Sequence, residues 1–150
     1  MKKFLISVVA AASAFAIVSP AHAVNLTPTF DVDITLNTAC IISTAPSNVV
    51  FTYTAFGGAA TSTGGGFGVT CTKNLTYTLA LDSTAVTDLA TNLAYTLALS
   101  SAAATGSGAA QAFTIAGAIA AGQAGSCAGS AASCTNTAST NKTRTLTVAY

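Results

Sequence analysis

The chain has 150 residues, a length that suits one domain, and only nine of them are charged: five Lys or Arg and four Asp. So few basic residues form no patch able to hold a phosphate backbone, and we expect no nucleic-acid partner. The single His, His22, lies within the first 23 residues, and the rest of the chain offers neither a Ser/His or Cys/His pair nor a Cys spacing typical of zinc sites. We therefore expect no catalytic residues, no metal or other cofactor, and no small-molecule substrate.

The first 23 residues have the pattern of a secretory signal peptide. Lys2 and Lys3 precede an uncharged apolar run over residues 4–18, and Ala21-His22-Ala23 is a small-x-small cleavage motif. The run is short for a membrane span, so we predict cleavage between Ala23 and Val24, with an uncleaved anchor as the alternative.

Removal of residues 1–23 leaves three cations, Lys73, Lys142 and Arg144, against four Asp, a net charge of −1. The surface must then consist of Thr, Ser, Asn, Gly and Ala. Such a surface lacks the charge repulsion that keeps ordinary domains apart. The composition favours an exported protein that works inside an assembly, and a small neutral secreted domain also fits it.

The segment 29–36 alternates without a slip, as a half-buried β-strand does. One face carries apolar residues and the other polar ones: Phe30, Val32, Ile34 and Leu36 against Asp31, Asp33 and Thr35. We predict an N-terminal strand segment over 24–37 and a sandwich domain over 38–150. The strand has two possible partners. Asn37 and Thr38 are enough for a hairpin within the domain, and the free leader also allows pairing with another molecule.

Further short strands follow, separated by segments of small and polar residues. Large odd-numbered residues share one face in 67–72, 75–81 and 93–99. The predicted strands are 39–43, 49–53, 67–72, 75–81, 93–99, 113–115 and 143–150, and the predicted loops or connections are 57–66, 83–92, 100–110, 116–125 and 126–141. Short strands at this spacing indicate an antiparallel β-sandwich.

Four Cys in an exported chain indicate two disulfides, for which three pairings exist. Cys127 and Cys134 flank a short loop of small residues, and we expect them to pair locally. Cys40 and Cys71 would then close the longer loop.

Several motifs occur in a characteristic order along most of the chain. They are Phe30-Asp31-Val32 with Leu36-Asn37 and Cys40, Val69-Thr70-Cys71, Tyr77 to Leu81, Leu93 to Leu97, Ala121-Gly122-Gln123, and Leu146 to Tyr150. In this order they resemble the spore coat protein U family, which includes subunits of archaic (Csu-type) chaperone–usher pili. The chain departs from the family pattern at Phe51-Thr52-Tyr53, which lacks a Gly, at Ala120 in place of Pro, and in the loop between Cys127 and Cys134.

The resemblance implies an incomplete immunoglobulin-like antiparallel β-sandwich that is completed by donor-strand exchange. Carried onto this chain, Phe30, Val32, Ile34 and Leu36 are donor side chains, and Leu146, Val148 and Tyr150 border the acceptor groove. The implied partners are identical or related pilin subunits, a periplasmic chaperone and an outer-membrane usher. The implied function is that of a cell-surface pilus subunit that serves adhesion and biofilm formation.

Two other functions stay open at this stage. The first is a coat or matrix protein of the same family that is complete in itself and stays monomeric without a chaperone. The second is a small binding module, which needs an exposed aromatic or polar cluster. Most Phe and Tyr residues stand at inward strand positions, which favours core over binding surface.

Overall fold

The computed structural model describes residues 25–62 and 64–150, so the predicted signal peptide and its cleavage site between Ala23 and Val24 lie outside the described residues. Residues 36–150 form one compact unit, and the segment before Leu36 belongs to a different unit. The described residues contain ten strands and no helix, and hence no helix among them is able to cross a membrane. The predicted all-β class is confirmed.

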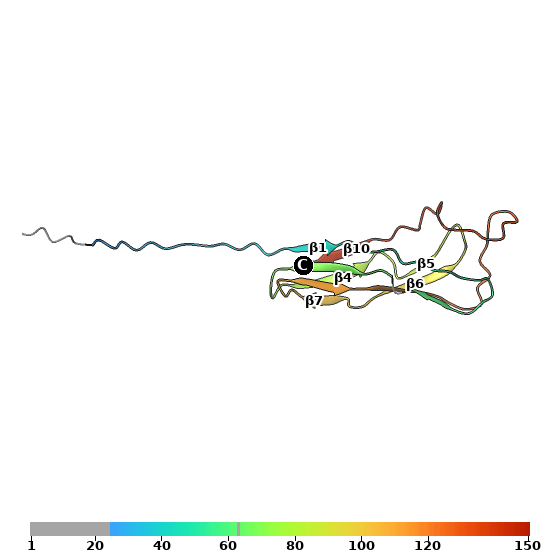
Figure 1. Cartoon of the computed structure of the whole chain (residues 1–150), viewed down its shortest axis with the longest axis horizontal. Coiled ribbons are helices and arrows are strands. Elements are labelled where there is room, and N and C mark those ends of the chain that lie inside the picture. The colour runs from blue at the N-terminus through green and yellow to red at the C-terminus, as the bar shows by residue number, and fades with distance from the viewer. Residues whose placement is uncertain (1–24, 63) are drawn as a thin grey trace, which may run out of the picture. The chain divides into compact units, whose positions relative to one another are not determined.

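The strands form three antiparallel sheets (Figure 1). The first has the order β1 (Cys40–Thr44), β3 (Phe67–Cys71), β8 (Ala110–Phe113). The second has the order β2 (Ala60–Ser62), β9 (Ile115–Ile119), β6 (Ala94–Leu99), β5 (Ala85–Thr87). The third has the order β10 (Leu146–Ala149), β4 (Thr76–Leu81), β7 (Ala103–Thr105).

The first two sheets continue into each other. Only Thr114 separates β8 from β9 along the chain. Gly65, which lies between β2 and β3, exchanges two backbone hydrogen bonds of 3.3 and 3.0 Å with Ile115 at the start of β9. These strands make one layer of the sandwich, and the sheet of β10, β4 and β7 makes the other. The two layers pack as an antiparallel β-sandwich, which is consistent with the expected immunoglobulin-like fold.

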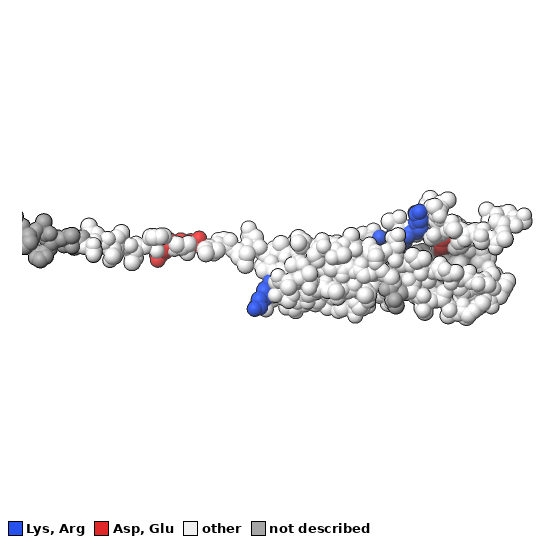
Figure 2. Space-filling view, in the orientation of Figure 1, with Lys and Arg blue, Asp and Glu red and all other residues white. Residues whose placement is uncertain are grey.

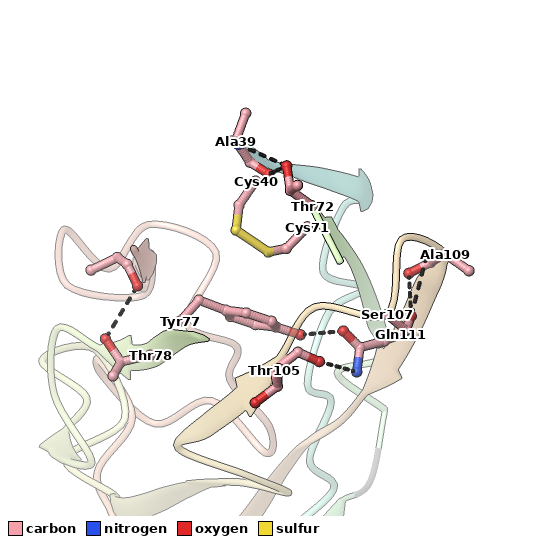
Figure 3. Close-up of a disulfide and its surroundings, with 11 residues drawn as sticks. Ala39, Cys40, Cys71, Thr72, Tyr77, Thr78, Thr105, Ser107, Ala109 and Gln111 are labelled. Atoms are coloured by element: carbon pink, nitrogen blue, oxygen red, sulfur yellow. Dashed lines mark hydrogen bonds between the residues drawn. A yellow bond between two sulfur atoms is a disulfide. The ribbon is translucent and has the colours of Figure 1, made fainter. Parts of the chain in front are cut away.

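The core forms where the sequence alternation predicts it. Inward residues from both layers are almost fully buried: Phe67, Val69 and Cys71 of β3, Tyr77 and Leu79 of β4, Leu97 of β6, Phe113 of β8 and Ile115 of β9. The Tyr77 hydroxyl donates to Oε1 of Gln111 at 3.0 Å, so this deeply buried ring keeps a partner for its polar end (Figure 3).

Both expected disulfides are present. Cys40 and Cys71 face each other in the register of β1 and β3 and are bonded (Figure 3), and Cys127 is bonded to Cys134. The long bridge therefore fastens the first strand of the compact unit to a central strand.

Several predicted loops were wrong. Strands β2, β5 and β7 and most of β9 lie in segments predicted as loops or connections. These strands are short and rich in Ala, Gly, Ser and Thr, so they lack the large alternating side chains by which a strand is recognised in a sequence. Backbone pairing with neighbouring strands holds them instead, as in the β2–β9 and β4–β7 registers.

The predicted strand at 49–53 was also wrong. Val49, Phe51 and Tyr53 are half-buried and Val50 and Thr52 are exposed, as the alternation requires, but the segment is not assigned as a strand. Among the described residues, its backbone makes no hydrogen bond to another backbone group. The side-chain pattern of a strand is present, whereas the ladder partner is missing.

The N-terminal segment likewise has the side-chain alternation of a strand without backbone pairing among the described residues. No strand is assigned over residues 25–39. The four apolar residues of its alternating face are largely exposed, with exposed fractions of 86% for Phe30, 70% for Val32, 85% for Ile34 and 74% for Leu36. Among residues 25–62 and 64–150, the half-buried strand predicted from the alternation therefore pairs with no other strand.

Candidate functional site: an open apolar groove

A groove of about 710 Å³ opens within the compact unit. Its apolar lining comes from the segment 49–53, from the inward faces of β6 and β9, and from the start of β10. The main contributors are Val49, Phe51, Tyr95, Leu97, Ile119 and Leu146. The rings of Phe51 and Tyr95 lie 6.0 Å apart between centroids. Apolar surface of this kind is stabilised when another apolar group covers it.

One wall of the groove is the segment 49–53, which is fastened at both ends. At its start, the Ser47 N–H donates to the Gly66 carbonyl at 3.0 Å, and the Ser47 hydroxyl donates to the Gly64 carbonyl. At its end, the Gln123 N–H donates to the Tyr53 hydroxyl at 2.8 Å. Between these anchors, the one hydrogen bond of the backbone runs from Val50 N–H to Ser62 Oγ at 3.3 Å. The wall is held in place with its own strand edge unpaired.

Gly117 of β9 lets this wall pack closely against the sheet. A Cβ atom at this position would overlap the ring of Phe51 and would lie 2.8 Å from Cγ1 of Val49. Real Cβ contacts are essentially never that short, so a larger residue would push the wall away. Gly117 thus leaves the space that the side chains of Val49 and Phe51 occupy against β9.

The other wall is formed by β10 and the residues before it. In the described part of the chain β10 pairs with β4 alone, so its second edge is free. Arg144 lies two residues before Leu146, and both residues line the groove. An unpaired strand edge next to an apolar surface is a template for strand addition.

Arg144 has both used and unused donors. Its guanidinium forms an ion pair with Asp82 (Nη1 to Oδ2, 3.5 Å) and donates from Nη2 to the Asn141 carbonyl at 2.8 Å. Its Nε is buried and has no hydrogen-bond partner among the described residues. Lys142, which also lines the groove, donates from Nζ to the Thr137 carbonyl at 2.8 Å.

The loop after Cys127 closes one part of the groove and is held by Asp88. This carboxylate is 3% exposed and accepts hydrogen bonds from Ala90 N–H, from the N–H and hydroxyl of Thr91, and from Nδ2 of Asn136. Burial alone raises the pKa of Asp88, but hydrogen bonds from Thr91 and Asn136 help to outweigh it and leave the pKa below its ordinary value. Charged Asp88 therefore stabilises the docked loop.

The residues expected to border the groove differ in their surroundings. Leu146 lines the groove, and Val148 packs against the core. Tyr150 is 63% exposed and lines a separate shallow depression with Thr76, Thr78 and Thr105. Within residues 25–62 and 64–150, no three His, Cys, Asp or Glu side chains gather as metal ligands would.

Two functional features were not predicted from the sequence. The first is the wall at 49–53, which was expected to be a paired strand. The second is Gln123, whose side-chain amide pairs with Ala94 through Oε1 at 2.7 Å and Nε2 at 2.8 Å. Gln123 thereby joins the start of β6 to the wall residue Tyr53. The motif Ala121-Gly122-Gln123 is visible in the sequence, but nothing in it indicates this contact.

The family model of the spore coat protein U domain matches residues 26–148. The chain belongs to the spore coat protein U domain family. The match includes the N-terminal segment, both walls of the groove and the loop with the second disulfide. No curated protein and no solved structure matches the chain significantly. The family consists of exported pilus and coat proteins with structural roles, and it includes pilus subunits of archaic chaperone–usher systems.

Proposed function

We propose that the protein is a structural subunit of a cell-surface pilus assembled by the chaperone–usher pathway. In this proposal, residues 29–36 of one copy add as a strand to the groove of the next copy. The observation that carries it is a groove with an apolar lining between two backbone edges that are unpaired in the described chain, those of the segment 49–53 and of β10. Strand addition supplies main-chain hydrogen bonds to such edges, and alternate side chains supply specificity.

The N-terminal segment has the chemistry of a matching occupant. Phe30, Val32, Ile34 and Leu36 lie on one face and are largely exposed in the single chain. Burying four side chains of this size would stabilise the assembled form by roughly 6–12 kcal/mol, before the hydrogen bonds along both edges are counted. The unassembled chain thus has both an exposed apolar strand and an open apolar groove.

Family membership supports the remaining parts of the proposal, because the family includes pilus subunits of archaic chaperone–usher systems. Before assembly, a periplasmic chaperone covers the groove, and an outer-membrane usher then exchanges the chaperone for the next subunit. The assembled fibre lies outside the cell and serves adhesion and biofilm formation. The alternative is a coat or matrix protein complete in itself, as the name of the family suggests. The open groove favours the pilus subunit over a self-contained protein.

A fused donor strand tests this function. Residues 24–37 are removed from the N-terminus and attached after Tyr150 through a flexible Gly/Ser linker. We expect a monomer with a higher melting temperature than the chain that lacks the segment. The matched control carries the same fusion with Ile34→Asp, which keeps the length and linker. Equal melting temperatures for the fusion, the control and the truncated chain would contradict the proposal.

A further inference from the structure

The exported chain has seven charged residues, three cations and four acids, and their positions are unequal. On the face shown in Figure 2, most of the surface is uncharged. Two of the three cations, Lys142 and Arg144, line the groove, whereas the third, Lys73, is exposed in the turn between β3 and β4. Two of the four acids, Asp31 and Asp33, lie on the polar face of the N-terminal segment.

The other two acids already have partners. Asp82 forms the ion pair with Arg144, and Asp88, which also lines the groove, is held by the hydrogen bonds that dock the loop. Lys142 donates to a neutral carbonyl and has no carboxylate within 4 Å in the described part of the chain. Arg144 keeps one buried donor, Nε, without a partner. Because the charge of Arg144 is already paired with Asp82, the cation of the groove that lacks a carboxylate partner among the described residues is Lys142.

Asp31 and Asp33 are exposed and form neither an ion pair nor a side-chain hydrogen bond among the described residues. They alternate with the apolar residues of the same segment. When Phe30, Val32, Ile34 and Leu36 turn into a groove, both carboxylates must face its mouth. Lys142 is exposed at this mouth.

We infer that Asp31 and Asp33 of one copy pair with Lys142 at the mouth of the groove of a second copy. This pairing rests on the proposed function and specifies its partner, namely a second copy of this chain. If the added strand shifted by one residue along the groove, both carboxylates would face its apolar lining. The charges and the alternation of apolar residues therefore favour the same register of the added strand. The pairing also favours self-assembly over donors that lack acids at these two positions.

Pairs at a groove mouth act mainly on the rate of encounter and on specificity. Each exposed pair contributes little to affinity, and its removal slows assembly by about two- to fivefold. Salt weakens such pairs because the Debye length falls to about 3 Å at 1 M. Assembly of the natural chain should therefore slow at high salt, and the dependence on salt should weaken when the charges are removed.

The test measures how fast the full exported chain forms SDS-resistant ladders at low and at high salt. Lys142→Gln removes the exposed groove charge, and Asp31→Asn with Asp33→Asn removes the donor charges. Lys73→Gln is the matched control, since it makes the same change at an exposed site that does not line the groove. We expect the groove and donor variants each to assemble about two- to fivefold more slowly at low salt, and Lys73→Gln to assemble at the natural rate.

Combining the groove and donor variants completes a double-mutant cycle. We expect the combination to be little slower than either variant alone, because both remove one interaction. Full additivity, or equal rates for Lys142→Gln and Lys73→Gln, would overturn the pairing. Ile34→Asp distinguishes this failure from failure of the proposed function. If it blocks assembly while the charge variants have no effect, only the pairing is wrong. If Ile34→Asp assembles normally, or if the natural chain forms no ladder, both are wrong.

Discussion

Ile34→Asp separates the stability of a single subunit from its ability to join another. Ile34 is 85% exposed in the single chain, and substitutions at such sites change the free energy of unfolding by no more than about 0.5 kcal/mol. In the proposed assembly the side chain enters the groove. Loss of its burial alone costs about 1.5–3 kcal/mol, a factor of roughly 10–150 in affinity. The buried carboxylate adds a desolvation penalty of several kcal/mol. We expect more than about a 100-fold loss of assembly.

The assay compares the yield of SDS-resistant ladders with the thermal unfolding of the unassembled chain. Thr35→Asp is the matched control, because it adds the same charge one residue away on the polar face, where the side chain is also exposed. Thr35→Asp should assemble normally. The reasoning is refuted if Ile34→Asp forms as much ladder as Thr35→Asp, or if Ile34→Asp unfolds the single chain.

Three further predictions concern the groove and its supports. Gly117→Ala places a Cβ 2.8 Å from Val49 Cγ1 and should lower the free energy of unfolding by about 1–3 kcal/mol in a denaturant titration. Gly58→Ala is the control, since its Cβ meets nothing within 4 Å and should change stability little. Equal effects of the two variants would contradict close packing at Gly117. The pKa of Asp88 is lowered in the folded chain, so its charge stabilises the loop fully above about pH 4, and this stabilisation is lost as the pH falls through the folded-state pKa. Asp88→Asn should therefore lower the melting temperature at pH 7 and make the melting temperature fall less steeply in acid. An unchanged dependence of the melting temperature on acid pH would contradict this role. Replacing Cys40 and Cys71 with Ala should lower the free energy of unfolding by about 3.7 kcal/mol, and replacing Cys127 and Cys134 should lower it by about 2.5 kcal/mol, because the sequence separations are 31 and 7. If chemical denaturation shows the larger loss for Cys127 and Cys134, loop length is not the main cause.

The sequence predicted those parts of the fold that rest on large alternating side chains. Tyr77 and Leu79, or Phe67 and Val69, mark a buried face by their spacing alone, and the structure buries them as expected. Strand β7, Ala103-Ala104-Thr105, has no such signal, and its pairing with Tyr77 and its neighbours becomes visible only in three dimensions. Small residues form strands wherever a neighbouring strand supplies a ladder, and that neighbour is distant in sequence.

The segment 49–53 shows that large alternating side chains do not guarantee a paired strand. Val49, Phe51 and Tyr53 have the spacing of a strand, and their side chains do turn inward, but no strand of the described chain forms backbone hydrogen bonds with them. Alternation reports which side chains face the core, and it does not report whether the backbone is paired. The role of Gln123 was equally hidden, because its contacts with Ala94 and Tyr53 span 29 and 70 residues of sequence.

The central claim is that residues 29–36 act between molecules. Size-exclusion chromatography with light scattering on the exported chain, beside a chain truncated before Asn37, tests it most directly. If these residues act between molecules, the full chain forms SDS-resistant multimers and the truncated chain forms none. Two stable monomers with the same melting temperature would contradict this claim, and so would a full-length monomer that unfolds when the segment is removed.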